Sequence, residues 1–456
     1  MSKTKIVWSC RECGHAQVKW TGSCSQCQQW NTLVEEASVE EKKARFESKS
    51  STGAKAIRIS DVPLGSFRRL STAMGELDRL FGGGIVEGSL ILVGGEPGVG
   101  KSTLMLQIAH SLAKQGLVVL YVCGEESAEQ TSLRARRLSI DHQNLYLLSE
   151  TSFSHIKGQI DQLQPDIAIV DSVQIVYKTE LSSAPGSVVQ VREIATEFMH
   201  LAKGQGITTF LIGHVTKSGD LAGPRVLEHL VDTVLDFEGD RQHGFRLLRS
   251  MKNRFGATDE IAIFQMKEDG LSEVQNPSQV FLQERQKELP GSAIVPGLEG
   301  ARSFLLEIQA LVTATSFPNP SRRSTGLDQN RLGLLLAVLE KRVGYQLHHC
   351  DVFVALAGGL KIVEPAIDLG IVLAISSSFM NRPISPDVIV LGEVGLAGEV
   401  RGVSRIETRL KEAIHMGFTK CVLPKKNLKG ISPLIQSKIQ LVGVDLVDEA
   451  IKELLG

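Results

Sequence analysis

The sequence predicts an α/β fold with a mainly parallel sheet in its central part, a small metal-stabilised domain before it and a separate α+β domain after it. Three observations lead to this prediction. Short apolar runs alternate with helix-period segments between about residues 56 and 285, an order typical of parallel sheets. Two CxxC pairs stand near the start of the chain. A new set of strand and helix patterns follows a stretch containing proline and glycine at 290–297.

Length and composition limit the class of protein. The chain has 456 residues, enough for two or three domains. Hydrophobic residues make up 42% and charged residues 22%, as in ordinary soluble globular proteins. The formal net charge is −1, so any contact with nucleic acid must come from local basic patches. No stretch resembles a membrane span, and the N-terminus MSKTKIVWSC lacks a secretory signal. We therefore expect a cytoplasmic protein without membrane contact.

The first domain is predicted from cysteine spacing. The chain has seven cysteines, of which Cys10/Cys13 and Cys24/Cys27 form two CxxC pairs separated by ten residues. Each pair places two thiolates on one tight turn, and together they complete a tetrahedral four-sulfur site, whose usual cytosolic occupant is Zn²⁺. The alternative is four free thiols, but so small a block has too little core to bury them. We predict a closed, structural zinc finger over residues 1–34.

Two further features accompany this finger. Trp8, Trp20 and Trp30 flank the cysteine pairs. We expect them to pack around the metal site, and stacking on nucleic-acid bases is the alternative. From residue 35 to residue 55 the chain is charged and serine-rich with almost no large apolar side chain, which predicts a flexible linker.

Residues 56–285 form the predicted α/β domain. Its expected strands are Leu90–Val93, Val118–Val122, Leu145–Leu148, Ile167–Val170 and Thr208–Ile212. Helix-period segments at Ser102–Lys114 and Ser187–Lys203 each carry one apolar face. The end of the domain differs, because Thr233–Phe237 and Phe245–Ser250 flank the turn-rich EGDRQHG, which indicates an antiparallel hairpin.

A glycine-rich loop predicts a nucleotide site. The segment from Gly95 to Ser102 fits GxxxxGK[ST], follows the apolar strand LILV and opens a helix, which is the context of a P-loop. Its glycines allow backbone N–H groups to surround a phosphate chain at a helix N-terminus. Lys101 is expected to reach the β- and γ-phosphates of ATP, and Ser102 to bind Mg²⁺. The residues predicted to bind the nucleotide are Gly95, Glu96, Pro97, Gly98, Val99, Gly100, Lys101, Ser102 and Thr103.

The same site needs an acidic residue for the metal. Asp171 ends the apolar run IAIVD, where a Walker B aspartate holds Mg²⁺ directly or through water. A turn or N-cap aspartate is the alternative.

Taken together, these motifs resemble the RadA (Sms) family of RecA-superfamily ATPases. The start of the family's RecA-like core resembles RLSTAMGELDRLFGGGIVEGSLILVGGEPGVGKSTL, a CxxC–CxxC finger precedes it, and the KNRFG segment, residues 252–256, matches a family signature. These features occur in the family's order over essentially the whole chain. The resemblance implies a DNA-stimulated, helicase-type ATP hydrolase of DNA recombination and repair. It also implies a homo-hexameric ring that binds single-stranded DNA, works beside RecA and promotes branch migration of branched recombination intermediates.

The resemblance implies roles for individual residues. In RecA-like ATPases the base that orients the attacking water follows the strand next to the P-loop strand, where this chain has Glu125 and Glu126. We favour Glu126, with Glu125 as the alternative. In the family, the KNRFG segment reaches toward the nucleotide of a neighbouring subunit, which makes Lys252 and Arg254 candidate cations acting in trans. Two ordinary surface cations are the alternative.

Two DNA-facing loops are also implied. By position they fall near Tyr177–Ser187, with Lys178, and near Val215–Arg225, with Lys217. Loops of this kind can follow phosphates without reading bases. His214, which ends the strand before the second loop, is a candidate sensor of the γ-phosphate, and a plain strand-end histidine is the alternative.

Residues 286–456 form the third predicted domain. Its strands are expected at Leu305–Thr313, Val352–Leu356, Val388–Leu391 and Cys421–Leu423, and its helices at Asn330–Lys341 and Arg405–His415. This α+β block resembles the proteolytic domain of Lon, which needs a serine activated by a lysine. Ala366 stands where the serine is expected and Glu407 near the expected lysine, so we predict an inactive Lon-protease-like domain. Its expected basic surface consists of Lys341, Arg342, Arg401, Arg405 and Arg409.

Other functions remain as alternatives. The first is an ATP-gated DNA clamp or scaffold that hydrolyses slowly and does not translocate. An ATP-dependent protease is disfavoured by Ala366, and a signalling ATPase of the KaiC type is disfavoured by the finger and the KNRFG segment.

Overall fold

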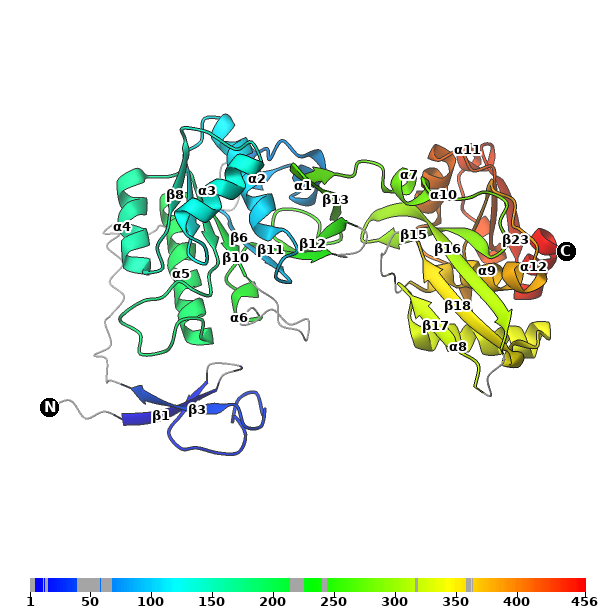
Figure 1. Cartoon of the computed structure of the whole chain (residues 1–456), viewed down its shortest axis with the longest axis horizontal. Helices are drawn as coiled ribbons and strands as arrows, with labels where there is room; N and C mark the ends of the chain where they lie inside the picture. Colours follow the sequence, from blue (N-terminus) through cyan, green and yellow to red (C-terminus); the bar gives the residue numbers. More distant parts are fainter. Residues whose placement is uncertain are drawn as a thin grey trace. The chain divides into compact units, whose positions relative to one another are not determined.

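The computed structural model describes residues 5–10, 12, 15–38, 58, 68–213, 225–239, 244–315, 319–357, 362 and 364–456. The chain divides into two compact units (Figure 1). The first contains residues 1–238, 248–258 and 266–272, and the second contains residues 239–247, 259–265 and 273–456. Among the described residues, no helix is both long enough and apolar enough to cross a membrane.

The N-terminal part is a small ribbon of three strands. Strands β1 (Lys5–Cys10), β2 (Ala16–Gln17) and β3 (Leu33–Ser38) form a sheet in the order β2-β1-β3, with β1 antiparallel to both neighbours. The pairing of β3 with β1 continues to Ser38, beyond the end at residue 34 that the sequence suggested. The described core of the ribbon contains Cys10, Cys24 and Leu33, which is too little apolar material to hold a fold without a further cross-link.

The central sheet has nine strands in the order β14-β13-β12-β11-β6-β10-β9-β7-β8. Their bounds are β6 Leu90–Gly95, β7 Val119–Cys123, β8 Leu145–Leu148, β9 Ile167–Asp171, β10 Thr208–Ile212, β11 Thr233–Gly239, β12 Phe245–Asn253, β13 Ile261–Lys267 and β14 Gly270–Glu273. Strands β11, β6, β10, β9, β7 and β8 pair in parallel. The predicted parallel sheet is therefore confirmed, and each expected strand of this block is present, although β6, β11 and β12 extend two or three residues beyond their expected ends.

The helices of this unit follow the predicted periodicity. They are α1 Gly75–Leu80, α2 Lys101–Lys114, α3 Ala128–Arg137, α4 Phe153–Leu163, α5 Val188–Gln205 and α6 Arg225–Glu228. All six residues of β6 are buried, as expected for a parallel strand covered on both faces. Leu90 and Leu92 of β6 share one apolar cluster with Val191 and Phe198 of α5. Ser187 caps α5 by accepting a hydrogen bond from the N–H of Gln190.

Strands β11 and β12 form the predicted hairpin, because the few residues between them are too short for the crossover that a parallel pair requires. The far ends of β12 and β13 belong to the second unit. The reason is an aromatic cluster in which the rings of Phe245 and Phe281 lie 5.3 Å apart and those of Phe281 and Phe304 lie 5.9 Å apart. Helix α7 (Pro277–Leu282), which carries Phe281, packs on β16 (Arg302–Ala314) of the second unit. The second unit thus begins before residue 286.

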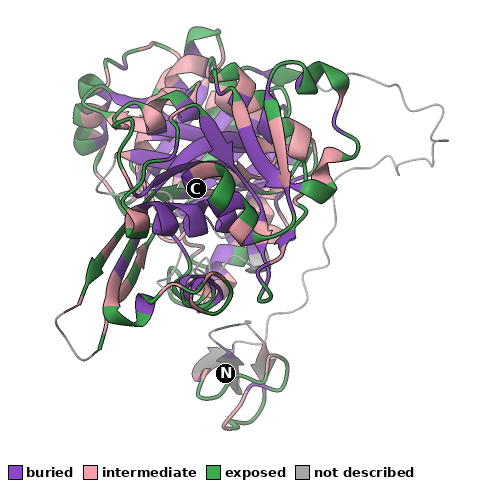
Figure 2. Ribbon diagram, turned by 90° about the vertical axis from the view of Figure 1, so that its right-hand side faces the viewer, coloured by how far each residue is buried: buried purple, intermediate pink, exposed green. Residues whose placement is uncertain are grey.

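The second unit is built on a seven-stranded sheet in the order β17-β18-β16-β15-β19-β22-β23. The remaining strands are β15 Ser292–Glu299, β17 Arg322–Thr325, β18 Cys350–Leu356, β19 Val388–Val390, β22 Lys420–Pro424 and β23 Gln440–Val444. Its other helices are α8 Gln329–Val338, α9 Asp368–Met380, α10 Ile406–His415, α11 Pro433–Gln436 and α12 Val447–Leu455. In Figure 2 the strands carry mostly buried residues, drawn in purple.

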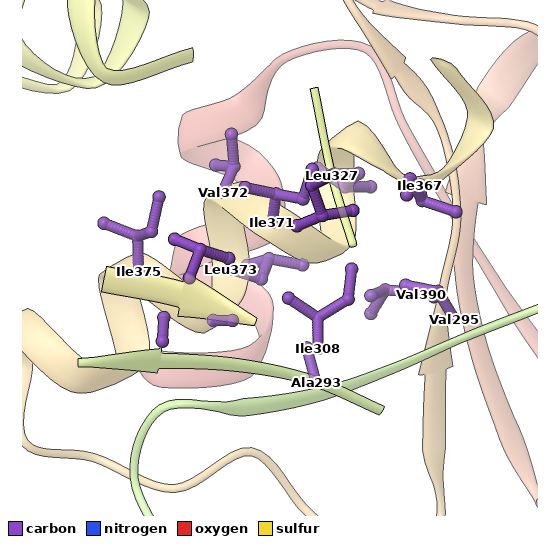
Figure 3. Packing of buried hydrophobic residues seen from close by; sticks show 14 of the residues in the cluster. Ala293, Val295, Ile308, Leu327, Ile367, Ile371, Val372, Leu373, Ile375 and Val390 are labelled. Carbon is purple, nitrogen blue, oxygen red and sulfur yellow. The ribbon is translucent and has the colours of Figure 1, made fainter. Parts of the chain in front are cut away.

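Helix α9 forms the centre of this unit. Its residues 368–377 are all buried, and Figure 3 shows Ile371 of α9 near Ile308 of β16. Gly370 allows the close approach, because a Cβ atom there would lie 2.1 Å from a methyl carbon of Val295. An apolar helix, buried over its first ten residues against a mixed sheet, makes this an α+β unit with a core of its own, as the sequence predicted.

Candidate functional site

The P-loop connects the end of β6 to the start of α2. Gly100 caps α2 in a left-handed conformation with φ of 114°, which glycine adopts without steric cost. A Cβ atom on Gly95 would lie 2.4 Å from the carbonyl oxygen of Phe237. Two glycines of the motif therefore permit backbone geometry that other residues would strain. Strand, loop and helix N-terminus have the arrangement that binds phosphate through backbone N–H groups.

Lys101 lies inside this loop. Its Nζ donates hydrogen bonds to the carbonyl oxygens of Gly95 at 2.8 Å and Glu96 at 3.0 Å. Burial lowers the pKa of Lys101, and the carboxylates of Asp171 and Glu125 oppose this effect. The ammonium is thus desolvated but surrounded by acceptors. A triphosphate would offer it stronger, charged acceptors in place of the neutral loop carbonyls.

Asp171 ends β9 as predicted, and the hydroxyl of Tyr121 on β7 donates to its Oδ2 at 2.7 Å. Tyr121 is buried, and burial followed by the nearby Asp171 raises the pKa of its hydroxyl well above the ordinary value. Tyr121 therefore remains a neutral donor that orients the carboxylate. A serine hydroxyl at the start of α2, Ser102, and a carboxylate oxygen are the hard ligands that Mg²⁺ accepts beside phosphate oxygens, so these residues fit the metal.

The two candidate bases lie in different surroundings. Glu125 accepts a hydrogen bond from the hydroxyl of Ser172, the residue after Asp171, and its charge acts on Lys101. Glu126 instead forms an ion pair with Arg134 of α3, with 2.5 Å between Nη2 and Oε1. The geometry thus favours Glu125 as the residue beside the nucleotide, although the sequence argument favoured Glu126. Adjacent side chains point to different partners here, which the motif CGEES does not reveal.

A further acidic residue near the P-loop escaped the sequence argument. Asp236 lies on β11 opposite Gly94 of β6. Burial raises the pKa of its carboxyl group and the charge of Glu238 adds to the shift, while Lys101 acts against it. Its signal in the sequence was a single acidic residue within the apolar run TVLDF, which becomes informative only when β11 is known to pair with the P-loop strand.

The KNRFG segment lies at the opposite end of β6. Asp232 donates its N–H to the carbonyl oxygen of Leu90 at 2.9 Å, and Arg254 contacts Asp232 through its Nη1 at 3.3 Å. Lys252 donates through Nζ to the carbonyl oxygens of Val231 at 2.9 Å and of Glu228. Since β6 extends from Leu90 to Gly95, roughly 16 Å of strand separates this end from the P-loop. Lys252 and Arg254 are therefore not brought together with Lys101 within one chain.

The first implied DNA loop is described in part by its contacts. Lys178 forms an ion pair with Glu197 of α5 at 2.7 Å and lies over the ring of Phe153, 5.8 Å from its centroid. The charge of Lys178 is therefore neutralised within its own chain. Of the second loop, His214, Lys217 and the other residues from 214 to 224 lie outside the described residues.

Three of the four predicted zinc ligands converge. The sulfur atoms of Cys10, Cys24 and Cys27 all lie within 4.8 Å of one another, while Cys13 lies outside the described residues. The turn at Cys24 is closed by a hydrogen bond from its N–H to the carbonyl oxygen of Gln29 at 2.9 Å. Convergent thiolates on tight turns suit a structural Zn²⁺ ion.

The tryptophans of the ribbon divide into two kinds. Trp8 packs against the cysteine cluster, as expected. Trp20 is 55% exposed, but the centroid of its ring lies 6.4 Å from that of Trp8, so it packs beside the site. Trp30 is 73% exposed, which does not support the expectation that it packs around the metal site.

The two positions at which the Lon resemblance would require a serine and a lysine are Ala366 and Glu407. Ala366 lies buried in the turn Pro365–Ile367 before α9, and Glu407 accepts a hydrogen bond from the N–H of Ser432 at 2.8 Å. Arg409, predicted at the surface, is fully buried, and that prediction is wrong. Its guanidinium pairs with the carboxylate of Glu364 and donates to the carbonyl oxygen of Pro296 at 2.7 Å. An ion pair within the core occupies this region instead of a nucleophile and its base.

Comparison with known proteins agrees with this architecture. Residues 56–220 match the family model described as AAA domain, residues 8–35 the Rubredoxin metal binding domain, and residues 335–427 Subunit ChlI of Mg-chelatase. A DNA repair protein RadA from Chlamydia trachomatis is 51% identical over 99% of both chains. Proteins of the same name from Halalkalibacterium halodurans and Bacillus subtilis are each 50% identical over 100% of both chains. With half of all positions identical along the full length of these relatives, this chain belongs to the RadA family.

Proposed function

We propose that this chain is an ATP-hydrolysing motor of DNA repair whose nucleotide site is completed by a second copy of the chain. The observation that carries the proposal is the separation of two half-sites along β6. Lys101 lies at the end of the strand, and the KNRFG segment contacts Asp232, which is hydrogen-bonded to Leu90 at the start of the strand. A P-loop site gains from an arginine supplied in trans, because that arginine stabilises charge on the transferring phosphoryl group.

The chemistry follows from the described side chains. Lys101 binds the β- and γ-phosphates, and Ser102 and Asp171 hold Mg²⁺, which neutralises charge on the phosphate oxygens. Glu125 accepts a proton from the attacking water. The oxygen of that water bonds to the γ-phosphorus, and the bond between the γ-phosphorus and the leaving ADP oxygen breaks. Arg254 of the neighbouring copy binds the γ-phosphate oxygens. The neighbour's contribution makes turnover depend on assembly.

The assembly we propose is a homo-hexameric ring that binds single-stranded DNA. Within it, the motor moves the branch point of recombination intermediates made by RecA. Membership of the RadA family supports a role in DNA repair, because the relatives carry that name. The ribbon binds Zn²⁺ through Cys10, Cys13, Cys24 and Cys27, and the second unit contributes to assembly and not to proteolysis.

The direct test is the ATPase rate of the purified protein with and without single-stranded DNA, beside Lys101→Ala. We expect stimulation by DNA, and a loss of at least about a hundredfold in the variant. Displacement of a labelled strand from a branched substrate then tests movement. A DNA-independent rate without strand displacement would replace the motor with an ATP-gated clamp.

A further inference from the structure

A buried carboxylate, that of Asp232, lies between the start of the P-loop strand and Arg254 of the KNRFG segment. The side chain of Asp232 is 3% exposed. Its Oδ2 accepts hydrogen bonds from the N–H of Leu90 at 3.0 Å and from Nζ of Lys203 at 2.6 Å, and its Oδ1 accepts from Nη1 of Arg254 at 3.3 Å. One carboxylate thus joins the first residue of β6 to two cations from other elements.

The main chain reinforces these contacts. The N–H of Asp232 donates to the carbonyl oxygen of Leu90 at 2.9 Å, and the N–H of Arg254 donates to the carbonyl oxygen of Asp232 at 3.1 Å. Asp232 therefore fixes both the backbone and the side chain of Arg254. The guanidinium itself remains accessible, because the Arg254 side chain is 52% exposed. A guanidinium has five N–H donors, so one contact to Asp232 leaves donors for a second anion.

Lys203 and Lys252 have different surroundings from Arg254. Lys203, in the last turn of α5, also donates to the carbonyl oxygen of Gly88 at 3.2 Å and lies 5.9 Å from the ring centroid of Phe255. Lys252 donates to two backbone carbonyl groups of its own chain. The Lys203 side chain is 49% exposed, but its Nζ is engaged by both Asp232 and Gly88. The two lysines therefore hold the segment in place, and Arg254 keeps N–H donors for a further anion.

We propose that Asp232 is the positioning residue for Arg254, holding its guanidinium in the orientation in which it meets the nucleotide of the neighbouring copy. Lys203 balances the second oxygen of the same carboxylate, and Lys252 has a structural role. This inference rests on the proposed trans-acting site and assigns within it a residue that no sequence motif marks. A fixed arginine loses less conformational entropy when it binds phosphate than a mobile one.

The first test is Asp232→Asn, which keeps the size of the side chain and an acceptor for the N–H of Leu90. We expect kcat for ATP to fall by about tenfold to a hundredfold, less than the roughly 10³-fold or greater loss of a trans-acting arginine itself. The KM for ATP should change by less than about twofold, since the P-loop of the same chain is untouched. The matched control is Asp161→Asn, the same chemical change at an exposed position of α4, which should leave both constants unchanged.

Mixed assemblies identify which half-site Asp232 serves. An Asp232→Asn chain has an intact P-loop, and a Lys101→Ala chain has an intact Arg254. Mixing the two should regain activity, because some interfaces then combine both intact halves. Mixing Asp232→Asn with Arg254→Ala should regain none. The reverse pattern would place Asp232 in the nucleotide-binding half and overturn the inference.

A reference mixture separates this inference from the function on which it rests. If Lys101→Ala mixed with Arg254→Ala regains no activity, the shared site itself is disproved. If that mixture regains activity but Asp232→Asn with Lys101→Ala does not, only the role of Asp232 is disproved. Should Asp232→Asn fail to fold, Lys203→Met leaves the carboxylate in place and should show the same complementation pattern with a smaller loss of kcat.

Discussion

The two units each place a helix N-terminus after a turn in the core, but the chemistry at the two positions differs. In the first unit α2 begins with Lys101 and Ser102, and Nζ of the lysine donates hydrogen bonds to neutral carbonyl oxygens of the loop. In the second unit α9 begins at Asp368, which accepts hydrogen bonds from Nε of Arg331 at 3.0 Å and from the N–H of Val394 at 3.1 Å. The first arrangement can exchange its partners for a phosphate.

In the second arrangement, the carboxylate of Asp368 already has hydrogen-bond donors from its own unit. Burial raises the pKa of Asp368, and the hydrogen bond from Arg331 opposes that shift. Arg409 and Glu364 form a second internal pair nearby in the same unit. Charges that are already paired in the core stabilise a conformation and are not available for catalysis. The difference between the two units shows that a charged side chain at a helix N-terminus can bind a ligand only where its hydrogen-bonding partners can be exchanged for that ligand.

The largest effect should come from separating the two candidate bases. Glu125→Gln should lower kcat by about 10²- to 10⁴-fold, the range for a general base, because the amide cannot accept the proton of the attacking water. Glu126→Gln, which removes only an ion pair with Arg134, should lower it by less than about twofold. Steady-state ATP hydrolysis at saturating Mg²⁺ measures both. A large loss in Glu126→Gln alone would restore the assignment that the sequence argument favoured.

The next effect concerns the internal pair of the second unit. Glu364→Ala leaves the fully buried guanidinium of Arg409 without its carboxylate, which should lower the free energy of unfolding of that unit by about 3–5 kcal/mol. Glu407→Ala is the control, since this residue loses one half-exposed contact to Ser432 and should cost about 1 kcal/mol. Chemical denaturation followed by circular dichroism measures the two values. Equal losses would show that Arg409 is hydrated when unpaired.

A smaller effect should follow from Tyr121→Phe. The change removes the hydrogen bond to Asp171 and keeps the buried ring. We expect the Mg²⁺ concentration for half-maximal ATPase activity to rise by about threefold to tenfold, equivalent to one hydrogen bond of about 1 kcal/mol. Titration of Mg²⁺ at fixed ATP measures the shift. An unchanged midpoint would mean that Tyr121 has no part in orienting the metal ligand.

The smallest effect should be that of Ala366→Ser. The Lon resemblance places the activating lysine near Glu407, which cannot take that role, so we expect the new hydroxyl to stay unactivated. We expect no ATP-stimulated cleavage of a fluorescent casein substrate above the level of the unchanged protein. Detectable cleavage would show that the second unit needs only its nucleophile to act, and the contrast between the two units would disappear.

Local patterns were sufficient to predict most of the elements. The strand LILV, the P-loop and the helix after it were predicted because glycine spacing and apolar periodicity are properties of neighbouring residues. The position of Asp171 at a strand end was predicted for the same reason. The spacing of the paired cysteines also predicted that their sulfur atoms lie close together, and three of the four sulfur atoms do so.

The sequence by itself determined the order of the domains, the nucleotide motif and the ribbon, because each depends on residues close together along the chain. Only the tertiary structure decided that Glu125 contacts Ser172 while Glu126 contacts Arg134, that Arg409 is buried, and that Asp232 meets Leu90 and Arg254. These contacts join residues far apart in the sequence, and a charged residue has the same local pattern whether its partner is water or a distant side chain. The physical reason is that burial and pairing are set by which strands become neighbours in the sheet.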